Sequence, residues 1–341
     1  MVARSARHDR ERVGIGGSDV KAVVIEEFGP PEVLVQQEVG DPAVGGGDVL
    51  IEVEFCNVTF VETQIRSGRA PHSSMLPPLP AILGNGAGGT VAAVGAEVDS
   101  RLLGARVVAS MSGSGGYAQL ASVPAAATIS VPDDLGMSDA VALLADGRTA
   151  VGLIDRAGIR PGETVLVEAA AGGVGSLLVQ LAKRAGGRVA AAAGGERKLA
   201  VARGLGADVA VDYRRPFWTD ELSSAIDGTA VDVVFDGVGG RIGREAFHLL
   251  GRGGRLCTFG MASGSFTAIG ETELSERSVI RLRGAVGDRG EMAALTARAL
   301  SSAATGALRA VVGQEVPLAN AADAHRAIEA RATIGKTLLV A

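Results

Sequence analysis

The segment from residue 163 to 183, ETVLVEAAAGGVGSLLVQLAK, constrains the fold more than any other part of the chain. It joins a short aliphatic run at residues 164–167 to a glycine-rich turn, and then to apolar residues at helical spacing. Such an aliphatic run is typical of a strand that is buried on both faces of a parallel sheet. The segment therefore predicts the strand, turn and helix from which doubly wound sheets are built.

The turn is close to the dinucleotide-binding pattern G-x-G-x-x-G. Ala170 replaces the first glycine, while Gly172 and Gly175 keep their spacing. The second glycine of the pattern lets the backbone approach a pyrophosphate, and the third lets the helix pack close to its strand. The phosphates then meet free N–H groups at the helix N-terminus, here at Gly173 and Val174. In a chain with 49 glycines a chance match is the alternative, so the flanking strand and helix carry the prediction.

Composition narrows the class of protein. A chain of 341 residues is too long for one compact core and predicts two domains. Hydrophobic residues make up 47% of the chain, but no uninterrupted run approaches the roughly eighteen needed to span a membrane, so a cytoplasmic protein is expected. The net charge of −5 without a basic stripe argues against a nucleic-acid partner. The two cysteines, Cys56 and Cys257, argue against a disulfide scaffold or a four-cysteine zinc site.

The first half of the chain is predicted to be rich in strands. Residues 1–19 contain arginine, glycine and serine but no apolar core, which predicts a flexible tail and not a secretory signal. Short β-forming runs separated by glycine and proline follow at residues 21–25, 33–35, 48–55, 89–94, 105–109 and 119–123. This spacing predicts a compact, largely antiparallel β domain.

The second half alternates between strand and helix. A helix is expected over residues 138–157, with Ser138 as its N-cap. Strand candidates follow at residues 165–168, 188–193, 207–212, 231–236, 255–259 and 279–286, with helical stretches between most of them. This alternation predicts a parallel, doubly wound sheet. Helices at residues 291–304 and 321–332, with strands at 308–312 and 336–340, are predicted to return to the first domain.

Six motifs occur in a recognisable order: KAVVIEEFGPPEVL at residues 21–34, TQIRSG at 63–68, LGNGAGGTVAAVG at 83–95, GGYAQ at 115–119, AAAGGVG at 169–175 and IGKTLL at 334–339. Together they resemble the medium-chain dehydrogenase/reductase superfamily, in particular its zinc-free quinone oxidoreductase branch. The resemblance implies an α/β fold: a GroES-like β domain from residues 20–144 and 287–341, and a Rossmann domain from residues 145–286. It also implies an active site in the cleft between them and a homodimer.

The resemblance also indicates the cofactor. A Rossmann site that prefers NAD usually has an acidic residue at the end of its second strand, and residues 193–195 contain none. The resembled branch holds the 2′-phosphate of NADPH with a Gly-Ser-x-x-Lys segment and with a tyrosine after the third strand. Gly194, Lys198 and Tyr213 occupy these places, which predicts NADPH. The alternative is that Arg197 and Lys198 are ordinary solvated residues of a helix.

Further cofactor contacts follow from the resemblance. Thr149 occupies the place of a threonine near the nicotinamide, although Arg148 replaces the usual leucine before it. Gly237 follows the fourth strand, and Phe259 and Gly260 follow the fifth, at the edge where a doubly wound sheet binds its ligand. Each could instead be a plain turn at the end of a strand.

The candidate catalytic residues differ from the residues that the resembled family has at the same positions. Zinc-dependent relatives bind their metal with Cys, His and a carboxylate, but Thr59 stands in the cysteine position and residues 84–86 stand where a His-Glu pair would be, so no metal is expected. Quinone oxidoreductases commonly have Asn in place of Thr59 and Tyr in place of Gln64. Both residues can still donate a hydrogen bond to a substrate oxygen, but neither is a convincing general acid.

These features together predict an NADPH-dependent, zinc-independent reductase of a small molecule, either a quinone or another α,β-unsaturated carbonyl. Hydride from the nicotinamide would add to a conjugated carbon while hydrogen-bond donors stabilise the developing oxyanion. Two alternatives stay open: an enoyl reductase that acts on a thioester or a biosynthetic intermediate, and an NADPH-binding protein with little reductase activity. A strand at residues 279–286 at the edge of the sheet would join two copies into a homodimer.

Overall fold

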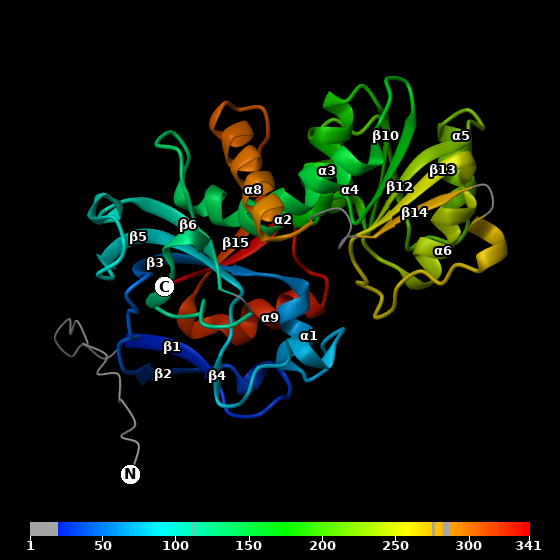
Figure 1. The fold of residues 1–341 in the computed structure, drawn as a ribbon. Helices are drawn as coiled ribbons and strands as arrows, with labels where there is room; N and C mark the ends of the chain where they lie inside the picture. Colours follow the sequence, from blue (N-terminus) through cyan, green and yellow to red (C-terminus); the bar gives the residue numbers. More distant parts are fainter. Residues whose placement is uncertain (1–19, 112, 275–276, 282–286) are drawn as a thin grey trace, which may run out of the picture.

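The structure is a computed structural model that describes residues 20–111, 113–274, 277–281 and 287–341 (Figure 1). The expected tail at residues 1–19 lies outside the described residues. Two groups of strands lie toward opposite ends of the molecule in Figure 1, with helices α2 (Met137–Ala157) and α3 (Gly173–Arg184) between them. Among the described residues, no helix combines the length and the apolar character needed to cross a membrane.

The first group of strands comes from both ends of the described chain. Its elements are β1 (Val20–Ile25), β2 (Val35–Val39), β3 (Asp48–Val58), β4 (Ala81–Ile82), β5 (Gly86–Val94), β6 (Arg106–Ser110), β7 (Leu120–Pro124), β8 (Thr128–Ser130), β15 (Val312–Pro317) and β16 (Lys336–Val340). The smaller sheet has the order β2-β1-β4, and the larger has the order β15-β16-β3-β5-β6-β8 with β7 also paired to β3. The last two strands, β15 and β16, therefore join the larger sheet of the first group.

The second group forms one parallel sheet. Its strands are β9 (Thr164–Glu168), β10 (Arg188–Ala193), β11 (Val209–Asp212), β12 (Val231–Asp236), β13 (Leu250–Thr258) and β14 (Ser278–Arg281), in the order β11-β10-β9-β12-β13-β14. Every neighbouring pair runs parallel. The order reverses between β9 and β12, and a doubly wound sheet binds its ligand outside the carboxyl ends of its strands at such a reversal.

Burial on both faces explains why β9 is purely aliphatic at its centre. All five of its residues are buried. Val165 and Val167 pack into one hydrophobic cluster while Leu166, between them, packs into another. Because alternate side chains of a strand point to opposite faces, both faces of the sheet must be covered.

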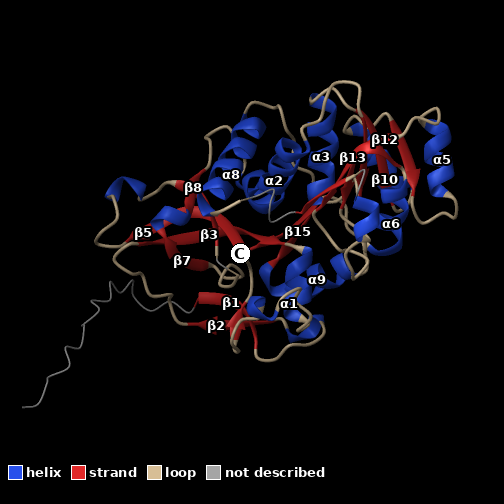
Figure 2. Ribbon diagram, turned by 45° about the vertical axis from the view of Figure 1, so that its right-hand side comes forward, coloured by secondary structure: helices blue, strands red, loops and turns tan. Residues whose placement is uncertain are grey.

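Helices cover the sheets and join them. Beyond α2 and α3, the described helices are α1 (Phe60–Arg66), α4 (Glu196–Gly204), α5 (Trp218–Ala225), α6 (Gly240–His248), α8 (Arg289–Ala304) and α9 (Ala321–Glu329). Figure 2 shows α2 between α8 and α3, and α2 also contacts β3, β5 and β6. One hydrophobic cluster consequently includes Leu144 of α2, Val165 of the parallel sheet and Leu338 of β16. We keep the division into residues 20–144 with 287–341 and 145–286 as a proposal, since α2 crosses its first boundary unbroken.

Several predicted boundaries are wrong for local reasons. The strand expected at residues 33–35 begins only at Val35, because Pro31 starts a 3-10 turn, Pro31–Val33. Ser138 does not cap α2: Gly136 is the N-cap, and the Ser138 hydroxyl donates to Glu315 at 2.6 Å.

The strand expected at residues 308–312 is β15, which starts at residue 312. Its residues are alternately exposed, so the apolar residues just before it do not mark the start of the strand. The strand expected at residues 279–286 is described only as β14, and residues 282–286 lie outside the described part.

Candidate cofactor and substrate site

The turn after β9 has the geometry of an anion-binding site. Gly172 is the N-cap of α3, and the helix begins at Gly173, so the first N–H groups of α3 need partners from outside the helix. A Cβ added to Gly175 would lie 2.2 Å from the carbonyl oxygen of Ala169, so α3 packs against the turn as closely as a glycine allows. Ala170 is fully buried and has no positive φ, which explains why alanine can stand in the first glycine position. The positive φ of the turn, 47°, belongs to Ala169 instead.

The loop before β16 closes this turn from the other group of strands. The Gly335 amide donates to the carbonyl oxygen of Ala171 at 2.7 Å, and Gly335 forms a β-bridge with Gly172. Gly335 has a φ of 61°, and a Cβ there would meet the backbone of Val311 at 1.9 Å. The two groups of strands therefore meet at the turn of residues 169–175, which we call the dinucleotide turn. No local sequence pattern indicated this contact.

A buried ion pair lies directly under the same turn. The ammonium of Lys336 donates to Asp146 at 3.1 Å, and both side chains are almost fully buried. A Cβ added to Gly173 would lie 1.9 Å from the other carboxylate oxygen of Asp146. Lys336 also acts electrostatically on Glu62, near the catalytic candidates. Lys336 thus connects the start of α3 with the substrate side, although the sequence showed it only as part of the IGKTLL motif.

Three cations gather beyond the ends of β10 and β11. The Lys198 ammonium donates to the carbonyl oxygen of Arg331 at 2.7 Å, and the pKa of Lys198 is lowered by burial and then by Arg214 and Arg331. Arg331, which follows α9, donates in turn to the carbonyl oxygen of Ala262 at 2.7 Å. The sequence pattern indicated Lys198 but neither arginine. Arg331 is 133 residues away from Lys198, so proximity along the chain could not have indicated it.

The other two predicted residues of this region lie against Arg214. A Cβ on Gly194 would be 3.2 Å from the Arg214 side chain. Arg214 is held by Asp212 through two guanidinium nitrogens, at 3.0 and 2.7 Å. Tyr213, between them in sequence, has its pKa raised mainly by burial. With Asp212 bound to Arg214, Lys198 and Arg331 keep charge available for an anion.

The predicted turns at the far side of the reversal also pack together. The amides of Phe259 and Gly260 both donate to the carbonyl oxygen of Asp236, at 2.9 and 3.3 Å. A Cβ on Gly260 would lie 2.5 Å from the oxygen of Gly237, and a Cβ on Gly237 would lie 2.5 Å from the Phe259 ring. The close approach of the two loops therefore requires glycine at both positions. Thr149 lies on α2, three residues after Asp146.

Glu168 and Asp236 form a buried acid pair at the ends of β9 and β12. Both are fully buried, and Asp236 accepts hydrogen bonds from the Gly239 amide at 2.7 Å and the Thr267 hydroxyl at 2.6 Å. Burial, and then the adjacent Asp236 carboxylate, raise the pKa of Glu168 well above its ordinary value. Glu168 is therefore the protonated member of the pair.

We expect Glu168→Gln to remove a loss of stability that begins as pH rises above the ordinary pKa of glutamate. Because the folded-state pKa of Glu168 is raised above the unfolded value, its contribution is complete below pH ~4.5 and declines as pH rises toward the folded-state value, by up to about 1.4 kcal/mol per pH unit. Urea unfolding at pH 5, 7 and 9 measures this slope. Glu221→Gln on α5 is the control for loss of a surface carboxylate. An unchanged slope in Glu168→Gln would contradict a protonated Glu168.

Thr59 is bound to a carboxylate that the sequence analysis missed. Its hydroxyl donates to Glu62 at 2.9 Å, and Glu62 also accepts the backbone amides of Thr59 and Asn85, at 2.5 and 2.6 Å. The pKa of Glu62 is raised by burial, against the opposing effect of these amides. The spacing Thr-x-x-Glu is the capping box that starts α1, and this signal was visible in the sequence. A substrate oxygen must therefore compete with Glu62 for the Thr59 proton.

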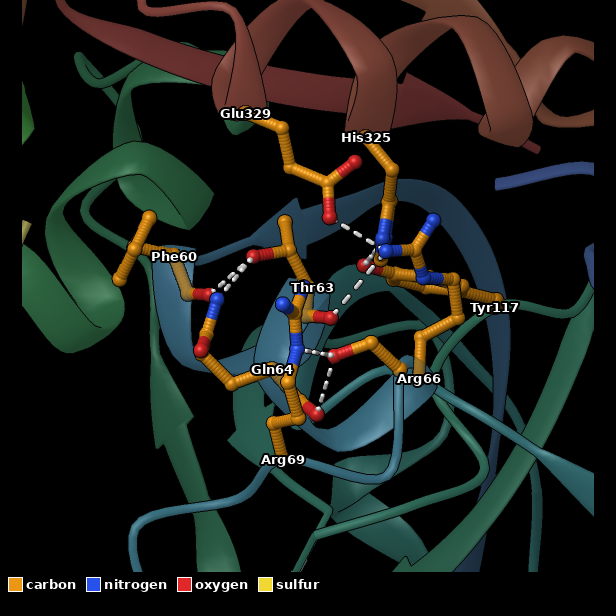
Figure 3. A network of polar contacts seen from close by, with 9 residues as sticks. Phe60, Thr63, Gln64, Arg66, Arg69, Tyr117, His325 and Glu329 are labelled. Carbon is orange, nitrogen blue, oxygen red and sulfur yellow. Dashed lines mark hydrogen bonds and ion pairs between the residues drawn. The ribbon is translucent and has the colours of Figure 1, made fainter. Parts of the chain in front are cut away.

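Gln64 lies on α1 with its amide near the first turn, as Figure 3 shows. The amide nitrogen donates to the Thr63 hydroxyl at 3.3 Å, and that hydroxyl donates to the carbonyl oxygen of Phe60 at 2.7 Å. On the other side of the helix, the buried Arg66 forms an ion pair with Glu329 of α9. Gln64 keeps one amide proton that no described residue accepts, which leaves it able to bind a substrate.

Tyr117 and His325 lie beside Arg66 of this helix (Figure 3). The Tyr117 hydroxyl and the His325 Nε2 are 3.0 Å apart, and both side chains are fully buried. Burial and then the Arg66 charge lower the pKa of His325 to about 3. The imidazole is consequently neutral, and it holds no proton that it could give up as an imidazolium at neutral pH.

Among the residues that the structure describes, no three His, Cys, Asp or Glu side chains are grouped as metal ligands would be. Cys56 is buried in the core of the first group of strands, where burial raises the pKa of its thiol to about 12. Cys56 is therefore a small core residue. Zinc independence itself stays a prediction.

Comparison with known proteins finds family matches and relatives that together cover most of the chain. Residues 45–133 match the family described as alcohol dehydrogenase GroES-like domain, and residues 173–301 match the family described as zinc-binding dehydrogenase. The quinone oxidoreductase of Salmonella typhimurium is 31% identical over 93% of this chain and 98% of its own length. The 2-haloacrylate reductase of a Burkholderia species is 31% identical over 94% and 99%.

A solved structure of Escherichia coli quinone oxidoreductase complexed with NADPH superimposes with a TM-score of 0.86 and 31% identity, and the match covers 94% of this chain and 100% of that one. The two family matches, the full-length relatives and this fold agree with each other. The chain belongs to the medium-chain dehydrogenase/reductase superfamily, in its quinone oxidoreductase branch.

Proposed function

We propose that this protein is a reductase that transfers hydride from NADPH to a quinone or another α,β-unsaturated carbonyl. The observation that carries the proposal is the arrangement around the dinucleotide turn: an α3 N-terminus closed by Gly335, with Lys198 and Arg331 joined beyond the end of β10. The first element suits a pyrophosphate and the second suits the 2′-phosphate of NADPH. The solved relative with bound NADPH supports the choice of cofactor.

Each predicted cofactor residue has a proposed role. The amides of Gly173, Val174 and Gly175 hold the pyrophosphate, with Ala170 and Gly172 shaping the turn. Lys198, Tyr213 and Arg331, over the surface formed by Gly194, hold the 2′-phosphate. Thr149, Gly237, Phe259 and Gly260 line the nicotinamide side. Bound NADPH would supply the hydride from its nicotinamide ring.

The protein's own contribution at the substrate is to orient and polarise the acceptor. We propose that the free amide proton of Gln64 and the hydroxyl of Thr59 bind the acceptor oxygen, where negative charge develops as hydride arrives. The interaction of Thr59 with Glu62 fixes the position of the hydroxyl. We propose that a proton for the product is taken from solvent, since neither the Gln64 amide nor the Thr59 hydroxyl can act as a general acid.

A screen of NADPH oxidation against quinones, enones and enoyl thioesters tests the function. We expect turnover with quinones or enones, and a decrease in kcat/KM of roughly tenfold for Thr59→Ala and for Gln64→Ala, since each loses a hydrogen bond worth about 1–1.5 kcal/mol. Thr229→Ala, on the exposed turn before β12, is the matched control and should leave turnover unchanged.

Other outcomes of the screen separate the alternatives. Stereospecific saturation of enoyl thioesters alone would favour an enoyl reductase. Tight NADPH binding with no turnover in any group would favour an NADPH-binding protein with little activity. Wild-type rates in both site variants would contradict the substrate contacts but not the cofactor site.

We also propose a homodimer. β14 is the last strand of the parallel sheet in the described part of the chain, and an edge strand pairs readily with a second copy. A monomer in size-exclusion chromatography coupled to light scattering would contradict this.

A further inference from the structure

Arg148 of α2 carries a charge that no described residue neutralises within ion-pair distance. Its guanidinium donates one hydrogen bond, to the Ser110 hydroxyl at 3.0 Å. Asp146, two residues earlier, is the acidic group that acts on it electrostatically, but that carboxylate is bonded to Lys336. Burial lowers the pKa of Arg148, so the guanidinium is partly withdrawn from water while it stays charged.

Through Ser110, the guanidinium contacts the strands that position Thr59, one of the proposed substrate-binding residues. Ser110 ends β6 and is the Cα partner of Gly86 on β5. Asn85, next to Gly86, donates its amide to Glu62, and Glu62 holds Thr59. Arg148 therefore bridges α2, beside the proposed nicotinamide contact Thr149, to the strands that position the acceptor.

A second side chain near these strands has no hydrogen-bond partner at all. Asn57 of β3 is 1% exposed, and neither its amide oxygen nor its amide nitrogen has a hydrogen-bond partner. The nitrogen lies 3.4 Å from where a Cβ on Gly86 would be. A buried amide without partners is unfavourable, and so is a partly buried cation without a counter-ion. Both features occur around Gly86, which is a sign of a polar ligand that the protein takes up there.

We infer that Arg148 binds a carboxylate of the substrate, so that the acceptors of this site are α,β-unsaturated carboxylic acids. This inference rests on the proposed reductase function and makes it more specific. Ser110 uses one of the five guanidinium donors, and the fork geometry of arginine matches a carboxylate through two parallel bonds. A planar guanidinium selects this geometry better than a lysine would.

The chemistry gives Arg148 a role beyond anchoring. Hydride from NADPH forms a bond to the β-carbon, the alkene π electrons move to the α-carbon and into the carboxylate, and a proton from water then bonds to the α-carbon. One NADPH and one proton are consumed for each saturated acid and NADP+ formed. Because charge builds up on the carboxylate oxygens in the transition state, Arg148 stabilises that state more than the ground state.

The decisive experiment compares an acid with its ester: 2-chloroacrylate and methyl 2-chloroacrylate, with NADPH, for wild type, Arg148→Leu and Arg148→Lys. For Arg148→Leu we expect kcat/KM to fall by about 10- to 150-fold with the acid, which corresponds to a charged hydrogen bond of about 1.5–3 kcal/mol. The ester should change by less than about threefold, and the KM for NADPH should not change. Arg148→Lys should recover part of the activity with the acid.

Stability and binding measurements keep the test independent of turnover. Unliganded Arg148→Leu should unfold at the same temperature as wild type or higher, because an unpaired cation has been removed. If the wild type reduces 1,4-benzoquinone but not the acid, the inference fails and the proposed function survives. If nothing is reduced, the proposed function fails, and titration calorimetry of 2-chloroacrylate into the NADP+ complex of wild type and Arg148→Leu still decides the inference. Equal losses for acid and ester, or weaker NADPH binding, would overturn it.

Discussion

Gly175→Ala is expected to weaken NADPH binding strongly and to destabilise the protein. The new Cβ would lie 2.2 Å from the carbonyl oxygen of Ala169 and 2.8 Å from its carbonyl carbon. These are backbone atoms of a turn that already holds a non-glycine residue at a φ of 47°, so the first turn of α3 must move away instead. Overpacking of this kind costs typically about 1–3 kcal/mol. Displacing two amides that bind phosphate weakens affinity by roughly 100-fold or more.

The measurements are the Kd for NADPH from nicotinamide fluorescence and the free energy of unfolding in urea. Gly204→Ala is the matched control, because it lies at the end of α4 and a Cβ there would have nothing within 4 Å. This control should bind NADPH normally and be equally or slightly more stable. Wild-type affinity in Gly175→Ala would mean that the pyrophosphate binds elsewhere.

The double variant Lys198→Ala, Arg331→Ala is expected to lose its preference for NADPH over NADH. In the proposed site each side chain would donate a charged hydrogen bond to the 2′-phosphate worth about 1.5–3 kcal/mol. We therefore expect kcat/KM for NADPH to fall by roughly 100-fold or more, while that for NADH stays within about threefold. Lys198 donates to the backbone of Arg331, so we expect the effects of the two substitutions on kcat/KM to be coupled. Both single variants are therefore needed to complete the double-mutant cycle.

Arg197→Ala controls for the loss of positive charge on α4. Arg197 is next to Lys198 but is exposed, so its removal should change kcat/KM for either cofactor by less than about threefold. An equal loss with NADPH and NADH in the double variant would show that the residues support the fold and not the 2′-phosphate. A wild type that uses NADH more efficiently would contradict the assignment of NADPH outright.

The sequence predicted the parallel sheet better than the other strands. In the parallel sheet, the predicted bounds of β10 and β12 agree with the structure, because each is an aliphatic run that ends at a glycine or a polar residue. In the other sheet, the predicted bounds of β16 agree as well. Prediction failed at β2 and β15, where turn chemistry at Pro31 and an edge position outweighed the apolar run. Strands buried on both faces are continuous aliphatic runs that can be recognised in the sequence. Edge strands with alternating exposure have a weaker sequence pattern.

The candidate site was predictable only where its residues are neighbours in sequence. Ala170, Gly172 and Gly175 form one turn, so their pattern could be seen directly. Asp146 and Lys336 meet across 190 residues, and no spacing rule connects them. Arg148 was visible as a departure from the family pattern, but its significance depends on its contact with Ser110.

The position of β16 determines the order in which the protein can assemble. β16 lies between β15 and β3, and it pairs with residues 55–58. On the ribosome, β3 must wait for this neighbour until residues 59–335 have been made, whereas the parallel sheet comes from the continuous stretch of residues 164–281. The nascent chain can therefore form its cofactor-binding sheet first, and β3 gains its last neighbour only when β16 emerges. Gly335 then reaches Gly172 in the same step, so the dinucleotide turn is completed only after the parallel sheet has been made.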